Sequence, residues 1–386
     1  MRVKLKDIFD LQMGKTPSRS NLEYWNTTDY KWISIADLTK TSKYIFETKE
    51  YLSKSAIKDS GIKVIPANTV VMSFKLSIGK TAITKEDMYS NEAIMAFKDK
   101  HVINIIPEYI FYLFKYKNWE ECSNKAVMGK TLNKATLSEI EVEICSIEKQ
   151  RQIVNILDKI MSAVDGRKQE LQLLDELIKA RFVEMFGDPV ANDKGWKMKP
   201  LLDMGKCKNG MNFHYDDSGV EISCLGVGDF KDLSVIDNTK KLSIVSLNEM
   251  PSEEYLLKDG DIVFVRSNGN KDLVGRSLAI YPGKLPTTFS GFCIRYRIHD
   301  DEITVPYLLR VLKMESMRKK MAGRGANIQN LNQQILGTLV IPVPPIELQN
   351  QFVDFVRAID KSKVAVQKAL DETQILFDSL MQKYFG

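Results

Sequence analysis

Two stretches of the chain carry apolar residues at alternating steps of four and three, the spacing of a coiled-coil seam. Arg167 and Arg181 interrupt the seam of the first stretch, and Lys363 and Thr373 interrupt that of the second. The predicted seam positions are Ile153, Leu157, Ile160, Val164, Leu171, Leu174 and Ile178, then Phe352, Val356, Ile359, Val366, Leu370, Phe377 and Leu380. The pattern predicts two long helices, over residues 146–187 and 344–386.

Start and stop signals support both helices. Ser146 can cap the first, Gly187 and Pro189 end it after Phe186, and a Pro-Pro pair at Pro344 precedes the second. From about residue 148 to 185, a rise of ~1.5 Å per residue gives a rod of roughly 55 Å. We expect a rod of that length to act as a spacer.

The other two segments, 1–145 and 188–343, show a different pattern. Short runs of strand-forming residues, such as 69–74 and 261–266, are broken by Gly, Asn and Asp. The sequence therefore predicts an α+β chain in which two mixed, mainly β globular domains are separated by the two long helices.

The chain also repeats itself. A shift of 199 residues places Ile147 on Ile346, Leu171 on Leu370 and Phe186 on Phe385, and it aligns the edges of the two globular segments, but not their middles. The helices repeat closely while the interiors of the globular segments do not, which fits two domains that recognise different signals. Antiparallel packing of the helices would relate the globules by a pseudo-two-fold axis, as paired DNA half-sites require, while parallel packing stays open.

Composition narrows the class of protein without naming it. The 386 residues are 44% hydrophobic and 27% charged, with a net charge of +5, which permits nucleic-acid binding without arguing for it. There is no apolar run of the roughly 20 residues that a membrane span needs, and the first residues lack the apolar core of a signal peptide. We expect a cytoplasmic protein that does not bind membranes.

No catalytic, metal or cofactor site emerges from the sequence. The five cysteines form no C-x-x-C pair, there are three histidines, and the three Gly-Lys-Thr triplets lack the first glycine of a phosphate-binding loop. A nuclease using Asp261 or Glu254 would need metal-dependent turnover by the isolated chain. The main alternative to a DNA-reading protein is a non-catalytic coiled-coil adaptor or scaffold without sequence-specific DNA binding.

Candidate DNA contacts lie near turn signals inside the globules, where loops on a rigid scaffold can present side chains to bases. They are Lys15, Arg19, Lys75, Lys80 and Lys130 in the first segment, and Arg266, Asn268, Asn270, Lys271, Arg276 and Arg324 in the second. For any one of them, a solvated loop charge is at least as good an interpretation.

The run 340–349, Val-Ile-Pro-Val-Pro-Pro-Ile-Glu-Leu-Gln, resembles the conserved region of type I restriction-modification specificity subunits. Residues 144–150 resemble it again, with Cys145 and Ser146 in place of the prolines. The resemblance implies that residues 1–145 and 188–343 are target recognition domains that each read half of a bipartite site in double-stranded DNA. It also implies that the helices set the spacing and dock two DNA methyltransferase subunits. Adenine methylation and ATP-dependent cleavage would belong to these partners and to restriction subunits.

Overall fold

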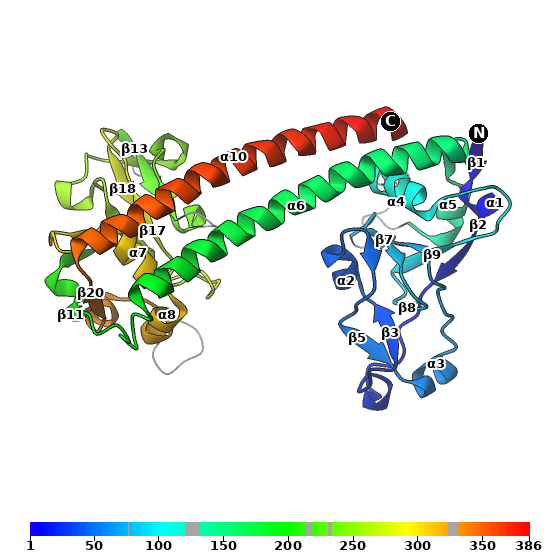
Figure 1. Cartoon of the computed structure of the whole chain (residues 1–386), viewed down its shortest axis with the longest axis horizontal. Coiled ribbons are helices and arrows are strands. Elements are labelled where there is room, and N and C mark those ends of the chain that lie inside the picture. The colour runs from blue at the N-terminus through cyan, green and yellow to red at the C-terminus, as the bar shows by residue number, and fades with distance from the viewer. Residues whose placement is uncertain (76, 120–131, 214–217, 231–233, 323–329) are drawn as a thin grey trace. The chain divides into compact units, whose positions relative to one another are not determined.

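The structure is a computed structural model that describes the chain except residues 76, 120–131, 214–217, 231–233 and 323–329. Its contacts divide the chain into unit 1, Met1–Gln169 with Gln367–Gly386, and unit 2, Glu170–Val366. Each unit contains one globule and parts of both long helices (Figure 1). The division falls inside the helices, whereas the predicted domain boundaries lie at their ends, because each globule packs on both helices.

Both long helices form where the sequence predicts them. Helix α6 spans Ile147–Phe186 and α10 spans Ile346–Phe385, 40 residues each. The Ser146 hydroxyl accepts a hydrogen bond from the Lys149 backbone N–H at 3.4 Å, which caps α6. Gly187 ends α6 with φ +76°, in the left-handed region that favours glycine.

The two helices are antiparallel, because within each unit the beginning of one lies beside the end of the other. In unit 1, Arg167 on α6 donates a hydrogen bond to the Ala369 carbonyl oxygen of α10 at 2.8 Å. In unit 2, the rings of Phe182 on α6 and Phe352 on α10 lie 5.4 Å apart. The parallel alternative is therefore wrong.

The predicted seam positions are all at least partly buried. Ile153, Leu157, Val164, Ile178, Phe352, Leu370 and Phe377 are buried, and the remaining seven are intermediate. Arg167, which interrupts the apolar seam, also lies at the helix contact, where the Ala369 carbonyl satisfies one of its donors.

The globule of unit 1 contains two mixed sheets and a small ribbon. One sheet has the order β2-β9-β6-β7-β4, another has the order β5-β3-β8, and β1 pairs with β10. The strands are β1 Arg2–Lys4, β2 Phe9–Met13, β3 Tyr30–Ile33, β4 Tyr44–Ile45, β5 Glu50–Leu52, β6 Val70–Ser73, β7 Thr81–Thr84, β8 Tyr89–Ser90, β9 Ile94–Asp99 and β10 Glu141–Glu143. The helices are α1 Leu5–Ile8, α2 Ile35–Lys40, α3 Lys54–Ser60, α4 Pro107–Tyr116 and α5 Lys134–Glu139, with a 3-10 turn at Leu22–Tyr24.

The globule of unit 2 has the same organisation. Its sheets have the orders β12-β19-β16-β17-β14 and β15-β13-β18, and β11 pairs with β20. The strands are β11 Lys197–Pro200, β12 Gly205–Asn209, β13 Val220–Leu225, β14 Val235–Ile236, β15 Ser243–Leu247, β16 Asp261–Val265, β17 Ser277–Ile280, β18 Thr287–Phe289, β19 Cys293–Ile298 and β20 Val340–Val343. The helices are α7 Val305–Lys313, α8 Glu315–Ala322 and α9 Gln333–Gly337, with 3-10 turns at Leu201–Asp203, Val227–Asp229, Thr239–Lys241 and Glu253–Tyr255.

The two globules thus share one topology, strand for strand, although the middles of their sequences diverge. The similarity extends to the rarer parallel pairs, because β3–β8 and β4–β7 correspond to β13–β18 and β14–β17. The duplication therefore includes the interiors of the globules, and the α+β fold with its internal repeat is confirmed.

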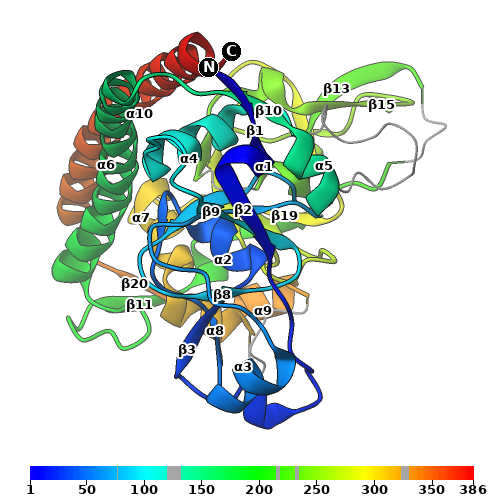
Figure 2. The same ribbon diagram turned by 90° about the vertical axis from the view of Figure 1, so that its right-hand side faces the viewer.

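One helix in each globule joins the larger sheet to the long helices; Figure 2 shows α4 beside α6 in unit 1. Tyr109 of α4 donates a hydrogen bond to the Glu143 carbonyl at 3.2 Å, and its ring lies 5.4 Å from that of Phe385 at the end of α10. In unit 2 the counterpart is Tyr307 of α7, whose ring lies 4.8 Å from that of Phe186 at the end of α6. Each globule is therefore closed by the last turn of the other repeat's helix.

A buried glutamine fixes the first turn of each long helix to its globule. Gln150 accepts a hydrogen bond from the Ile106 N–H at 3.0 Å and donates to two backbone carbonyls. Gln349, its repeat, accepts from the Thr304 N–H at 2.9 Å and likewise donates to two carbonyls. Both side chains are fully buried, so these glutamines position each helix start.

Candidate nucleic-acid interface

Seven of the predicted DNA contacts lie in one pair of equivalent loops. Lys75 and Lys80 lie in the hairpin loop between β6 and β7. The corresponding loop between β16 and β17, residues 266–276, carries the others: Arg266, Asn268, Asn270, Lys271 and Arg276. The common topology therefore places the candidates of both globules at the same point of the fold, although their sequences differ.

The backbone of Arg266 is fixed at the start of the unit 2 loop. Its N–H donates to the Phe292 carbonyl at 2.7 Å, and its carbonyl accepts from the Leu331 N–H at 2.8 Å. The guanidinium has a long contact of 3.5 Å to the Gly291 carbonyl oxygen and is partly exposed. Arg266 thus combines a fixed backbone with a side chain that is held weakly, which suits a residue that contacts an external ligand.

The rest of this loop is braced by its own polar side chains. The carboxamide oxygen of Asn268 accepts from the Asn270 N–H at 2.8 Å, and that of Asn270 accepts from the Asp272 N–H at 3.1 Å. Arg276 donates to the Asp272 carbonyl at 3.2 Å. These turns give both asparagines a structural role, since asparagine commonly bonds the backbone two residues on. Lys271 is exposed in the same loop.

In unit 1, the structure brings the charges of two candidates, Lys75 and Arg19, close to Glu92, which follows β8. The Thr16 hydroxyl donates a hydrogen bond to the Glu92 carboxylate. This bond lowers the pKa of Glu92 below its ordinary value, with further help from the positive charges of Lys75 and Arg19. Residues far apart in sequence therefore form one polar cluster at the sheet edge, which the sequence alone did not reveal.

Arg19 has several partners within the globule. Its guanidinium lies 3.7 Å from the centre of the Trp25 ring and 4.9 Å from that of Trp32. It also forms a two-pronged ion pair with Glu50, with Nη2 3.0 Å from Oε2. Stacking and a bidentate carboxylate give Arg19 a structural role, and its role in DNA binding stays a prediction.

The remaining candidates differ in their surroundings. The Lys15 ammonium donates to the Ser60 carbonyl, and Lys80 is exposed while its backbone pairs with Ser73. Lys130 and Arg324 lie outside the described residues. DNA contact is therefore a prediction for each of these residues.

One further residue beside the unit 2 loop escaped the sequence analysis. Phe292 is 60% exposed, and its carbonyl binds the Arg266 backbone. Because it lies beside the loop that carries Arg266, this exposed ring is a further candidate contact. Only the fold could reveal it, because Phe292 precedes a buried strand and has the pattern of a core residue.

The described residues do not support the nuclease alternative. Asp261 is 1% exposed and is bound by Arg297 through two contacts of 2.7 Å, so its carboxylate has a structural partner. Glu254 pairs with Lys208 at 2.7 Å. Throughout the described part of the chain, no three His, Cys, Asp or Glu residues form a group that could hold a metal ion.

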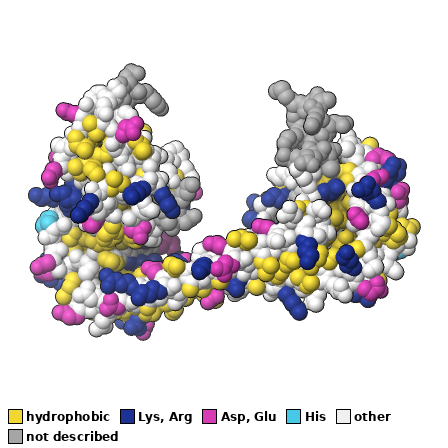
Figure 3. Space-filling model, turned by 90° about the horizontal axis from the view of Figure 1, so that it is seen from above, with side chains coloured by type: hydrophobic (Ala, Val, Ile, Leu, Met, Phe, Trp, Pro, Cys, Tyr) yellow, Lys and Arg dark blue, Asp and Glu magenta, His cyan; other side chains and the backbone are white. Residues whose placement is uncertain are grey.

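One face of the described surface mixes charges of both signs. On the face drawn in Figure 3, Lys and Arg side chains lie among Asp and Glu side chains on both units. This distribution matches the modest net charge of +5. On this face, contacts at particular loops would contribute more to DNA affinity than a broad positive field. Among the helices that the structure describes, none is long and apolar enough to cross a membrane.

Comparison with known families identifies the repeat. Residues 1–176 and 193–373 match the model of the type I restriction modification DNA specificity domain, once in each half of the chain. The chain belongs to this family. The resemblance seen in the sequence is thereby confirmed. The function of the chain is DNA specificity in a type I restriction-modification system.

Full-length relatives support the assignment. The specificity subunit of the type I restriction enzyme MjaIX from Methanocaldococcus jannaschii is 25% identical, with 98% of this chain and 91% of the relative covered. The specificity subunit of the type I restriction enzyme StySPI from Salmonella potsdam is 24% identical, with 92% of this chain and 82% of the relative covered. The crystal structure of the S subunit from M. genitalium has a TM-score of 0.54 at 15% identity and covers 100% of this chain and 96% of that one. A structure from a study of type I R-M complex assembly gives a TM-score of 0.61 at 16% identity, with 100% of this chain and 97% of that one covered.

Proposed function

We propose that the two globules read the two halves of a bipartite, gapped site in double-stranded DNA. The observation that carries this proposal is that equivalent loops, β6–β7 and β16–β17, carry different side chains on one shared topology. A common scaffold gives both readers the same geometry, while the loops can differ in the bases they contact. The domains for this role are residues 1–145 and 188–343.

The long helices would set the spacing between the half-sites and dock two DNA methyltransferase subunits. Restriction subunits would join through that complex, and the partners would supply adenine methylation and ATP-dependent cleavage in the cytoplasm. The exposed apolar residues Leu173, Leu177, Leu376 and Ile375 on α6 and α10 support docking, since such residues on long helices are typical of binding surfaces.

The test is to express the chain with methyltransferase subunits encoded beside it and to map methylated adenines in the host DNA. A gapped, two-part motif supports the proposal. An active methyltransferase complex whose methylation follows no such motif would contradict it and favour the coiled-coil adaptor.

Point variants test the division between the globules. Arg266→Ala should relax selectivity in one half of the motif, and Lys75→Ala, in the equivalent loop of the other globule, should affect only the other half. Lys63→Ala, distant from the loop in sequence and exposed, is the control. Equal loss in both halves from Arg266→Ala would contradict the two-reader model.

A further inference from the structure

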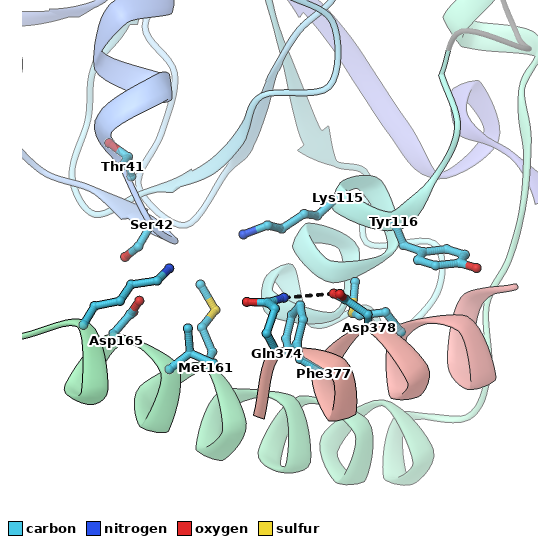
Figure 4. A pocket seen from close by; sticks show the side chains of 12 residues that line it. Thr41, Ser42, Lys115, Tyr116, Met161, Asp165, Gln374, Phe377 and Asp378 are labelled. Atoms are coloured by element: carbon cyan, nitrogen blue, oxygen red, sulfur yellow. Dashed lines mark hydrogen bonds between the residues drawn. The ribbon is translucent and has the colours of Figure 1, made fainter. Parts of the chain in front are cut away.

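The two units contain equivalent cavities where the α4 or α7 helix faces the long helices, but the cavities differ in charge. The cavity of unit 1, about 530 Å³, is shown in Figure 4. Lys115 extends into it from α4, and Lys168 also lines it, while Asp165 on α6 and Asp378 on α10 provide two acidic side chains. Its lysines and aspartates are therefore equal in number.

The cavity of unit 2, about 400 Å³, is lined by more cationic than acidic side chains. Arg310 and Lys313 of α7 line it, together with Ser234, the residue before β14. Lys363 also lines it but already forms an ion pair with Asp175 at 2.8 Å. Asp360 is the other acidic residue of the lining, so three cationic side chains share two carboxylates in this cavity.

Comparison of the repeats identifies the charge that unit 2 lacks. In unit 1, the buried Lys43 before β4 forms an ion pair of 2.5 Å with Asp158 on α6, and Tyr112 also donates to that carboxylate. In the repeat, Ser234 takes the position of Lys43 and Arg310 that of Tyr112. The shift of 199 residues places Arg357, a cation, where Asp158 provides the anion.

Arg310 shows the effect of this missing charge. Its Nε and Nη2 atoms are buried and have no hydrogen-bond partner among the described residues. Lys313 donates to the Ser234 hydroxyl at 2.7 Å, a neutral partner. Burial, with the charges of Arg310 and Arg276, lowers the pKa of Lys313 to about 8. The Arg310 guanidinium interacts with the charge of Asp175, which also pairs with Lys363. Two of its buried nitrogen atoms still lack hydrogen-bond partners, and buried donors without partners are costly.

We propose that the cavity of unit 2 binds a phosphate-class oxyanion, with the Lys313 ammonium and the Ser234 hydroxyl as donors and Arg310 as the main compensating charge. A phosphate group carries several acceptor oxygens, so it can accept from the ammonium and the hydroxyl at once and still face the guanidinium. The cavity volume accommodates such an anion with its remaining water. The phosphate could be free in solution or part of a DNA backbone. This inference concerns unit 2 alone and does not depend on which bases the loops read.

The test uses the full chain and inorganic phosphate as the probe. We expect phosphate, at constant ionic strength set with chloride, to raise the melting temperature and to broaden its own phosphorus NMR signal. Arg310→Met and Lys313→Met should each abolish both effects. Lys115→Met, the matched change in the charge-balanced cavity of unit 1, should leave them intact.

Arg310→Met also distinguishes a ligand site from a structural arginine. In buffer without phosphate, this variant should be at least as stable as the parent chain, because it removes a partly buried charge with two unsatisfied buried nitrogen atoms. A clear loss of stability there, or an unchanged phosphate response, would overturn the proposal.

Duplex DNA distinguishes the two sources of phosphate. If the duplex displaces inorganic phosphate in the NMR experiment and Arg310→Met lowers the salt dependence of duplex binding, the ligand is a backbone phosphate. If inorganic phosphate stays bound beside saturating duplex, the ligand is a free anion. Absence of any interaction with both probes contradicts the site, whereas the methylation test of the two-reader model would be unaffected.

Discussion

Replacing Gln349 by leucine tests whether the buried glutamine holds the α10 start to its globule. Leucine has nearly the same size but cannot bond. The change leaves the Thr304 N–H and the carbonyls of Glu302 and Pro344 without the side chain that binds them at 2.9, 2.8 and 2.9 Å. At ~1–1.5 kcal/mol for each of these three lost hydrogen bonds, the free energy of unfolding of unit 2 should fall by about 3–4.5 kcal/mol.

The repeat provides an internal duplicate of this experiment. Gln150→Leu removes the corresponding bonds to the Ile106 N–H and to the carbonyls of Asn104 and Cys145, at 3.0, 3.1 and 3.0 Å. It should therefore destabilise unit 1 by a similar amount. Gln351→Leu, at an exposed position on α10, is the matched control and should change stability by less than ~0.5 kcal/mol.

Urea unfolding measures these changes, and amide hydrogen exchange at residues 302–306 and 104–108 assigns each change to its unit, since two units need not unfold in one step. Exchange should accelerate at 302–306 in Gln349→Leu and at 104–108 in Gln150→Leu. A loss of less than about 1 kcal/mol in the free energy of unfolding of Gln349→Leu would refute the energy assigned to these hydrogen bonds. Faster exchange spread equally over both units would refute the assignment of each glutamine to its own unit.

Three further changes have calculable directions. Asp158→Ala leaves the buried Lys43 without its carboxylate and should cost about 2–3 kcal/mol in urea unfolding, while adding Lys43→Met should recover much of the loss. Gly187→Ala should cost about 1–2 kcal/mol by the same method, because φ is +76° and a Cβ would lie 1.9 Å from Asp193 Oδ1. The pKa of Lys313 is about 8 in the folded state and 10.5 in the unfolded state, so between these pH values the unfolded state binds more protons. The free energy of unfolding should therefore rise with pH over this range. Lys313→Met should flatten this rise, as measured by urea unfolding at several pH values. The charged groups around Lys313 are Arg310 on α7, Arg276 in the β16–β17 loop, Asp175 on α6, and Asp360 and Lys363 on α10.

The long helices could be predicted well because their signals are local. A seam spacing of four and three residues depends on neighbours within one or two turns, and the structure places Leu157 and Phe352 in the interior as that spacing requires. The strands 69–74 and 261–266 could be located for the same reason, and they appear as β6 and β16. The common strand order of the globules could not be predicted, because strand pairing joins residues that are distant in sequence and because the sequences of the two globules diverge.

The candidate site could be predicted only as a set of loops. Turn signals located the β6–β7 and β16–β17 loops correctly, but the partner of each side chain depends on tertiary contacts. Arg19 looks like a free loop cation in the sequence, yet it stacks on Trp25 and Trp32. Phe292 has the pattern of a strand residue and is exposed. Identifying base contacts therefore requires the fold and the DNA together.

The structure adds a second role for the long helices, which the sequence predicted to be spacers. Phe385 at the end of α10 packs on Tyr109 in the first globule, and Phe186 at the end of α6 packs on Tyr307 in the second. A rod that only set a distance would not need to contribute to either core. Because each globule is completed by the other repeat's helix, loss of helix pairing would open both globular cores at their α4 and α7 faces. Helix pairing and globule stability are therefore coupled, and a substitution at the helix seam should weaken the globule of its own unit as well as the rod.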